Sequence, residues 1–239
     1  MFAIDPRHQP RALADTFARF GRLHLPDFLA LGSAQTLYTA LADRVAWNRA
    51  FNAGGRHIDS PLELYQAQDP GVLAQLDQVV LEAATHGFQY RFDSYKVSDA
   101  VISGQAADPV LKAAYDLVNG LEFLTLVRQL TGDDRVRFCD LQATRYRPGD
   151  FLTAHSDLMD GKNRLYAYVL NLTPNWIADW GGLLAFLDQD GHVAEAYTPR
   201  FNALNIFRVP QNHCVTYVAP FAGAPRLSLT GWIRHGTPE

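Results

Sequence analysis

Apolar residues recur every three or four positions through much of the first ~130 residues, a period that predicts amphipathic helices. Two of these helices open on aspartate followed by proline, at Asp69-Pro70 and Asp108-Pro109, where the aspartate side chain can cap the first turn. Ser33 is the expected cap of another helix. The predicted helices cover residues 11–20, 33–43, 69–87 and 108–130.

The pattern changes in the second half, where short runs rich in aromatic and β-branched residues alternate with turn dipeptides such as Pro-Gly, Asp-Gly and Gly-Gly. Many short strands at regular spacing predict a sandwich, a jelly roll or a barrel. Because helices stand in one block and strands in another, a βαβ parallel sheet is disfavoured. The predicted strands cover residues 136–146, 165–172, 183–187, 203–209, 213–218 and 227–233.

The chain has 239 residues, of which 48% are apolar, so it can bury a core without disulfide or zinc staples. We expect a single domain of the α+β class over residues 1–239, because neither a repeat nor a low-complexity linker divides it. Residues 1–134 are the predicted helical buttress, with a few strands. Residues 135–239 are the predicted strand-rich core.

Charge and cysteine content exclude several functions. The net charge is −4 and no lysine or arginine run exists, so direct nucleic-acid binding is not expected. The two cysteines cannot build a disulfide framework or a paired metal knuckle. The polar N-terminus does not fit a signal peptide, and no run of about 20 apolar residues predicts a membrane span. These features predict a cytoplasmic protein without a membrane partner.

A metal site is predicted from the spacing of His155 and Asp157, because residues i and i+2 of a strand face the same side. A second imidazole would complete a two-histidine, one-carboxylate triad, which leaves coordination positions open on one side of an iron(II) ion. His213, at the start of a predicted strand, is a better third ligand than His192 after a turn or His235 near the chain end.

Strand alternation also places Arg226 and Ser228 on one face of the segment 226–229, with leucines on the other. A buried arginine is costly unless an anion pairs with it. A dicarboxylate ligand can provide that anion through a bidentate contact. The alternative is an internal ion pair with Asp140 or Asp150.

Several short segments complete this picture: Tyr-x-Pro-Gly-Asp at 146–150, Asn-Leu-Thr-Pro-Asn-Trp at 171–176, Gly-Gly-Leu-Leu-Ala-Phe at 181–186, and Arg-Leu-Ser-Leu-Thr-Gly-Trp at 226–232. With the order His-x-Asp, distal His and Arg-x-Ser, residues 136–236 resemble the 2-oxoglutarate and iron(II)-dependent oxygenases, and their prolyl hydroxylase branch in particular. The most similar group hydroxylates a proline of a small-subunit ribosomal protein. The resemblance implies a double-stranded β-helix (a cupin-like jelly roll) buttressed by the N-terminal helices.

The resemblance also implies site roles. His155, Asp157 and His213 would hold iron(II). Arg226 would bind the distal carboxylate of 2-oxoglutarate, with Ser228 hydrogen-bonding beside it.

Three further residues have alternative roles. Tyr146 matches a family tyrosine that reaches the co-substrate, or is a core tyrosine. Trp232 matches a bulky residue near the metal, or is a core tryptophan. Asn171 stands where the family often has a tyrosine that assists the arginine, while Tyr166 and Tyr168 have the opposite strand parity. Either Asn171 acts directly, a water intervenes, or a bulge turns a tyrosine inward.

The implied reaction uses iron(II), 2-oxoglutarate and O₂, releases succinate and CO₂, and hydroxylates a proline in a protein or peptide substrate. A ribosomal protein is the expected substrate. Ascorbate is the expected reductant that restores oxidised iron. The segments 51–59 and 160–164 are either substrate-side loops or ordinary connections.

Other functions remain open at this stage. The same triad would serve an oxygenase of a free amino acid or another small molecule. A cupin-like metal-binding protein without turnover would not need Arg226 and Ser228. A nucleic-acid demethylase fits poorly with the acidic charge balance.

Overall fold

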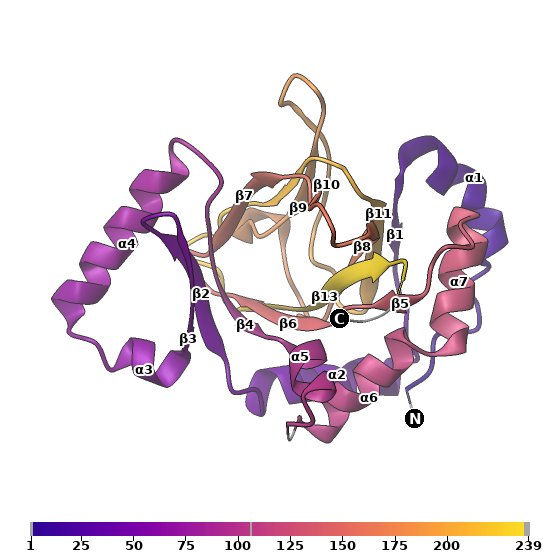
Figure 1. Cartoon of the computed structure of the whole chain (residues 1–239), viewed down its shortest axis with the longest axis horizontal. Helices are drawn as coiled ribbons and strands as arrows, with labels where there is room; N and C mark the ends of the chain where they lie inside the picture. The colour runs from indigo at the N-terminus through magenta and orange to yellow at the C-terminus, as the bar shows by residue number, and fades with distance from the viewer. Residues whose placement is uncertain (1, 106, 237–239) are drawn as a thin grey trace.

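The computed structural model describes residues 2–105 and 107–236, and within them 13 strands form one antiparallel sheet that curls into a nearly closed barrel (Figure 1). The principal strand order is β1-β11-β8-β13-β6-β4-β7-β12-β9-β10, with β2 and β3 extending the sheet beside β4, and β5 pairing with β13. This architecture is the double-stranded β-helix expected from the sequence. The strands are β1 (Arg22–Leu25), β2 (Asn48–Ala53), β3 (Arg56–Pro61), β4 (Tyr90–Tyr95), β5 (Phe138–Cys139), β6 (Gln142–Tyr146), β7 (Phe151–His155), β8 (Arg164–Asn171), β9 (Leu184–Leu187), β10 (Val193–Tyr197), β11 (Ala203–Arg208), β12 (His213–Val215) and β13 (Arg226–Arg234).

The α-helices cover the barrel from outside. α3 and α4 lie beside β2 and β3, and the other α-helices pack near β1, β5, β6 and β13 (Figure 1). They are α1 (Pro10–Phe20), α2 (Leu31–Asp43), α3 (Leu62–Gln66), α4 (Pro70–Ala84), α5 (Val97–Ile102), α6 (Pro109–Val118) and α7 (Leu121–Thr131). A short 3₁₀ helix covers Ala178–Trp180. No helix in the described part of the chain is long and apolar enough to cross a membrane.

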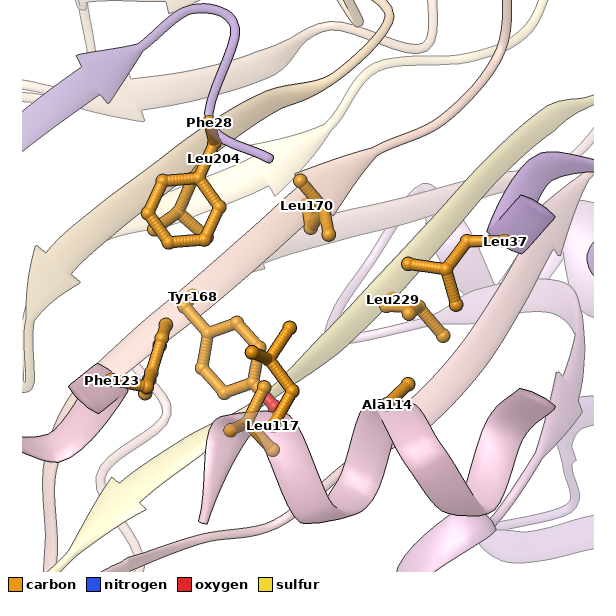
Figure 2. Close-up of a pocket in the computed structure, with 10 residues that line it drawn as sticks. Phe28, Leu37, Ala114, Leu117, Phe123, Tyr168, Leu170, Leu204 and Leu229 are labelled. Atoms are coloured by element: carbon orange, nitrogen blue, oxygen red, sulfur yellow. The ribbon is translucent and has the colours of Figure 1, made fainter. Parts of the chain in front are cut away.

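The two faces of β8 separate the structural core from the barrel interior. Tyr168 and Leu170 belong to the large apolar cluster beneath the helices, whereas Ala167 and Val169 belong to a smaller cluster on the other face. A small apolar pocket lies between helices and sheet, lined by Phe123 and Leu117 from the helices and by Leu170 and Leu229 from the strands (Figure 2). This pocket is therefore part of the helix–sheet core.

Two helix starts follow the predicted caps. The side chain of Asp69 accepts a hydrogen bond of 2.7 Å from the backbone amide of Gly71, and Asp108 accepts one of 2.8 Å from Val110. The predicted start at Ser33 is wrong, because α2 begins at Leu31. The Ser33 hydroxyl instead accepts a hydrogen bond of 3.2 Å from the amide of Ala3.

The single helix predicted over residues 108–130 is also wrong, since α6 ends at Val118 and α7 begins at Leu121. The Asn119 side chain accepts a hydrogen bond of 2.9 Å from the Cys139 amide and donates one of 3.1 Å to the Cys139 carbonyl. Because Asn119 makes this contact with β5, the helix does not continue through it. Gly120 is the N-cap residue of α7.

The first half of the chain also builds the barrel. β1 pairs with β11, and β4 lies between β6 and β7. The barrel wall therefore crosses the predicted division at residue 134, and helices and strands form one continuous body around a shared sheet.

Candidate metal centre and co-substrate pocket

Three candidate ligands converge inside one end of the barrel. His155 ends β7, and His213 begins the neighbouring strand β12 directly opposite it. Asp157 lies between them, with one carboxylate oxygen 3.4 Å from Nε2 of His155 and the other 3.5 Å from Nε2 of His213. Ligand atoms of all three residues lie within 4.8 Å of one another, which suits a single metal ion.

The reason for this convergence differs from the predicted one. We expected His155 and Asp157 to share a face of one strand, but β7 ends at His155. Asp157 has a positive φ of 61°, a conformation uncommon for residues other than glycine. Arg164 donates a hydrogen bond of 3.0 Å to the Asp157 carbonyl oxygen. The left-handed turn, not strand alternation, returns the carboxylate to the imidazoles.

The two imidazoles have the orientation of metal ligands. Nδ1 of His155 lies 3.0 Å from the Thr153 carbonyl oxygen, and Nδ1 of His213 lies 2.8 Å from that of Gln211. A carbonyl only accepts, so Nδ1 carries the proton and Nε2 presents a lone pair. Two lone pairs facing a carboxylate repel each other unless a cation lies between them. The donor set therefore fits a divalent metal such as iron(II).

Protonation states support the same reading. Burial, together with the neighbouring His155, lowers the pKa of His213 to about 4, so the His213 ring is neutral at physiological pH. Burial alone would raise the pKa of Asp157. The polar groups that face the carboxylate, His155, His213 and Trp232, outweigh this effect and lower the pKa. A neutral histidine and an ionised carboxylate are the forms that bind metals.

Arg164 and Trp232 support Asp157 from one side. The guanidinium carbon of Arg164 lies 3.5 Å from the centre of the Trp232 ring, a close cation–π contact. Since Trp232 bonds to the Asp157 carboxylate and Arg164 to its carbonyl, both ends of this residue are held. The segment 160–164 thus contributes through Arg164, a residue whose role the sequence did not reveal.

Arg226 lies further inside, 1% exposed, without a carboxylate partner among the described residues. Its Nη2 donates a hydrogen bond of 3.3 Å to the Asn171 side-chain oxygen, and its guanidinium carbon lies 5.1 Å from the centre of the Tyr146 ring. Its Nε has no hydrogen-bond partner in that part of the chain. Burial lowers the pKa of Arg226 to about 10.

The internal ion pairs considered from the sequence do not form. Asp140 pairs with Arg234 at 3.3 Å, and the Asp150 carboxylate pairs with Arg49. A buried cation without a counter-anion is costly. Arg226 is therefore placed to bind the carboxylate of a ligand, as 2-oxoglutarate would provide.

Asn171 contacts Arg226 directly. Its side-chain oxygen also accepts a hydrogen bond of 3.3 Å from the Ser228 hydroxyl. The pairing of β8 with β13 runs without a shift from Tyr166 to Asn171, so no bulge turns a tyrosine inward. The Tyr168 hydroxyl donates a hydrogen bond of 2.7 Å to the Asp140 carbonyl, and Tyr166 bonds to the Asp133 carboxylate at 3.2 Å, both away from Arg226.

Close packing explains the two glycines that open the segment 181–186. A Cβ atom on Gly182 would lie 3.2 Å from Cδ of Arg226 and 3.1 Å from the Trp176 ring, and its φ is +63°. A Cβ atom on Gly181 would lie 2.0 Å from the Tyr217 carbonyl oxygen. Both positions need glycine, because Gly181 lies against the Tyr217 carbonyl and Gly182 against Arg226.

The metal end of the barrel opens beside an aromatic rim. Phe88 is exposed, and the centre of its ring lies 5.4 Å from the centre of the His155 ring. The centre of the Tyr90 ring lies 5.6 Å from that of Phe88. The segment 51–59 lies mostly in the β2–β3 hairpin, where exposed His57 hydrogen-bonds to the Tyr90 hydroxyl rather than joining the triad. Tyr90 also donates a hydrogen bond of 3.1 Å to Asn52.

Residues 141–234 match the family model of the 2OG-Fe(II) oxygenase superfamily. Over these residues the chain is similar to the 2OG-Fe(II) oxygenases. This match covers the triad, Arg226 and Asn171, and the similarity to this superfamily implies iron(II), 2-oxoglutarate and O₂ as reactants. It confirms the predicted class of oxidoreductase.

The chain is similar to prolyl hydroxylases in sequence and fold. It is 30% identical over 118 residues to the Mus musculus protein named prolyl 3-hydroxylase OGFOD1, covering 46% of this chain and 21% of that protein. The aligned region thus spans about a fifth of that relative. A Pseudomonas putida prolyl-4-hydroxylase has the same fold, with a TM-score of 0.62 and 19% identity, covering 96% of this chain and 100% of the other.

A Trichoplax adhaerens prolyl hydroxylase, solved with a peptide fragment of the hypoxia inducible factor oxygen degradation domain, superposes with a TM-score of 0.59. Its identity is 15%, and the match covers 95% of this chain and 89% of the other. At such identities the structural matches establish the fold alone. Together with the sequence match, the comparisons confirm the predicted prolyl hydroxylase resemblance.

Proposed function

We propose that this chain is an iron(II)- and 2-oxoglutarate-dependent dioxygenase that hydroxylates a prolyl residue of a protein. The main support is Arg226, a fully buried guanidinium that lacks an anionic partner in the described residues and lies in the same barrel as the metal triad. Iron(II) and 2-oxoglutarate, when bound, couple oxidative decarboxylation to succinate and CO₂ with oxygen transfer to a carbon–hydrogen bond.

The chain's own residues bind and orient these groups. His155, Asp157 and His213 would hold iron(II) and leave one side open. Arg226 would bind the distal carboxylate of 2-oxoglutarate, with its guanidinium oriented by Asn171. Each of these contacts acts inside the barrel, where little water competes.

The remaining pocket residues shape the co-substrate site. Ser228 shares the Asn171 oxygen with Arg226, and Tyr146 lies against the guanidinium. The Tyr146 hydroxyl stays protonated, because burial raises its pKa far above the ordinary value. It would therefore act as a hydrogen-bond donor to the co-substrate.

The substrate assignment rests on relatives and on the mouth of the barrel. The relatives are named prolyl hydroxylases, and one was solved with a peptide. Phe88 beside His155 provides an exposed apolar surface at the metal end, which suits a segment of polypeptide. We propose a ribosomal protein as the substrate, and ascorbate as the reductant that restores oxidised iron.

We also propose a cytoplasmic location, which the free thiols of Cys139 and Cys214 support.

The test is turnover. Purified protein with iron(II), 2-oxoglutarate, ascorbate and air would be assayed for succinate, with and without proline-bearing peptides from small-subunit ribosomal proteins. We expect peptide-dependent succinate and the addition of one oxygen atom to a proline. The matched peptide with alanine in place of proline serves as control. Succinate release that no proline peptide stimulates would contradict the substrate proposal, and the absence of succinate would contradict the enzyme proposal.

A further inference from the structure

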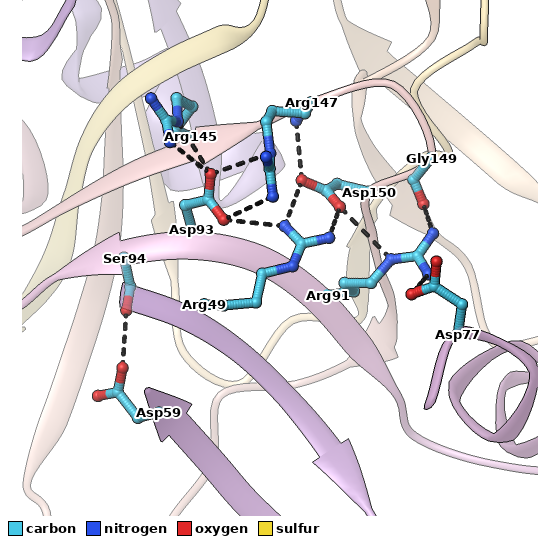
Figure 3. A network of polar contacts seen from close by, with 10 residues as sticks. All are labelled: Arg49, Asp59, Asp77, Arg91, Asp93, Ser94, Arg145, Arg147, Gly149 and Asp150. Carbon is cyan, nitrogen blue, oxygen red and sulfur yellow. Dashed lines mark hydrogen bonds and ion pairs between the residues drawn. The ribbon is translucent and has the colours of Figure 1, made fainter. Parts of the chain in front are cut away.

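A buried network of arginines and aspartates links β2, β4, β6 and the turn that follows β6 (Figure 3). Its two central carboxylates, Asp93 and Asp150, are both fully buried. Buried charges of this kind are costly unless hydrogen bonds satisfy them. The network consists of Arg49, Asp77, Arg91, Asp93, Arg145, Arg147 and Asp150.

Arg49 of β2 bridges the two carboxylates. Its Nη1 donates hydrogen bonds of 2.9 Å to both Asp93 and Asp150, and its Nη2 donates one of 2.5 Å to the second oxygen of Asp150. The contact with Asp150 is a bidentate fork, which fixes orientation as well as distance. Burial opposes the charge of Arg49, but these carboxylates outweigh it and raise its pKa.

Asp150 closes the turn that joins β6 to β7. Its carboxylate accepts a hydrogen bond of 2.8 Å from the Arg147 amide, and its own amide donates one of 2.9 Å to the Arg147 carbonyl. Its carbonyl accepts one of 3.0 Å from the Val218 amide. The turn is therefore tied to β2 through Arg49 and to the chain that follows β12 through Val218.

Both ends of this turn lead into the site. Tyr146 immediately precedes it, stacks on Phe92 with ring centres 5.0 Å apart, and lies against Arg226. β7 follows it and ends at His155. The Arg147 amide binds the Asp150 carboxylate, and Arg147 directly follows Tyr146. Displacement of this carboxylate would therefore shift the backbone next to Tyr146 and move the tyrosine side chain.

We propose that Arg49 and Asp150 are positioning residues, whose buried pair sets the place of Tyr146 against Arg226 and thereby the affinity for 2-oxoglutarate. The predicted effect on 2-oxoglutarate affinity rests on the proposed function, whereas the predicted position of Tyr146 does not. Neither residue touches the reacting groups. If the pair were purely structural, its loss would affect folding and all kinetic constants alike. If the pair positions Tyr146, its loss would raise the KM for 2-oxoglutarate much more than it lowers kcat.

The test uses Arg49→Lys, which keeps the charge and loses the fork, and Asp150→Asn, which keeps the shape and loses the charge. Asp77→Asn is the matched control, because Asp77 pairs with Arg91 of the same network but its side chain is 50% exposed. We expect the KM for 2-oxoglutarate to rise about tenfold in both test variants, with kcat changed less than about threefold. The control should match the wild type.

Combining Arg49→Lys with Asp150→Asn tests whether the two residues act through the same contact. We expect the effects on KM to be less than additive in the double variant, since both changes remove the fork between Arg49 and Asp150. Thermal unfolding identifies a variant that fails to fold, and Arg49→Lys is the milder change in that case. Unchanged KM in a folded Arg49→Lys or Asp150→Asn variant, with wild-type turnover intact, would overturn the positioning role while leaving the proposed function standing.

A second measurement needs no activity. A crystal structure of metal-free Asp150→Asn should show the Tyr146 ring displaced from Phe92 and Arg226. Unchanged stacking of Tyr146 would overturn the proposal even if the wild-type protein proved inactive.

Discussion

Arg226 and Asn171 face each other across two paired strands inside the barrel, and the guanidinium donates a hydrogen bond of 3.3 Å to the amide oxygen. The amide orients the arginine without neutralising it. The charge of Arg226 therefore remains for a ligand, which makes this neutral contact central to the proposed co-substrate site.

Replacing Arg226 by glutamine should have opposite effects on binding and on stability. The affinity for 2-oxoglutarate should fall by about 2–3 kcal/mol, because a bidentate charged contact is lost. The metal-free protein should become more stable by about 1 kcal/mol, since an uncompensated buried cation is removed. Co-substrate titration and urea unfolding measure the two effects, and a loss of stability together with unchanged affinity would contradict this view of Arg226.

Asn171→Asp should block the co-substrate. The new carboxylate would pair with Arg226 and compete with the distal carboxylate of 2-oxoglutarate, so we expect at least about a tenfold loss of affinity. Thermal unfolding of the metal-free variant should occur at a higher temperature than in the wild type. Asn205→Asp, a carboxylate added on neighbouring β11, provides the comparison, and equal losses in both variants would argue against a direct Asn171–Arg226 role.

Arg164→Gln should weaken iron(II) binding. Without the guanidinium, the left-handed turn at Asp157 loses the donor to its carbonyl and the partner of Trp232, and supporting groups of this kind are worth about tenfold or more in metal affinity. Competition with a metal-binding dye under anaerobic conditions measures this, with exposed Arg200→Gln as control. Wild-type metal affinity in Arg164→Gln would contradict the supporting role.

The metal-free protein should lose stability in mild acid. Burial lowers the pKa of His213 from 6.5 to about 4, so below pH 6.5 the unfolded chain takes up a proton that the folded chain excludes. The full stability is therefore present above pH 6.5 and declines as the pH falls toward 4. Between pH 7 and pH 5 we expect this residue to account for about 2 kcal/mol.

Urea unfolding in the presence of a chelator measures this dependence. His213→Gln should lose most of it, whereas His192→Gln, at an exposed position, should keep it. An identical pH dependence in His213→Gln and in the wild type would show that His213 is not its source.

The sequence predicted the interior residues best where strands are regular. In β13, alternation correctly put Arg226 and Ser228 on one face and Leu227 and Leu229 on the other, where the leucines join the large apolar cluster. The same parity argument correctly kept Tyr168 away from Arg226.

Features created by contacts distant in sequence could not be predicted. The turn at Asp157 has no local glycine, and it is held by Arg164 and Trp232. The break after α6 depends on a contact between Asn119 and β5.

The arginine–aspartate network could not be predicted from the sequence either. Arg49 and Asp93 stand 44 residues apart in the chain, yet they are buried together. Their pairing is visible only once the β6–β7 turn lies beside these strands.

The most direct test of the central claim is anaerobic titration of the metal-free protein with iron(II) and then with 2-oxoglutarate, followed by visible absorption. The account predicts a weak charge-transfer band from the iron–co-substrate chelate in the wild type. The band should disappear in Asp157→Ala, and in Arg226→Ala it should appear only at much higher 2-oxoglutarate concentration. No band in the folded wild type, or an unchanged titration in both variants, would contradict the claim that these residues build an iron and 2-oxoglutarate site.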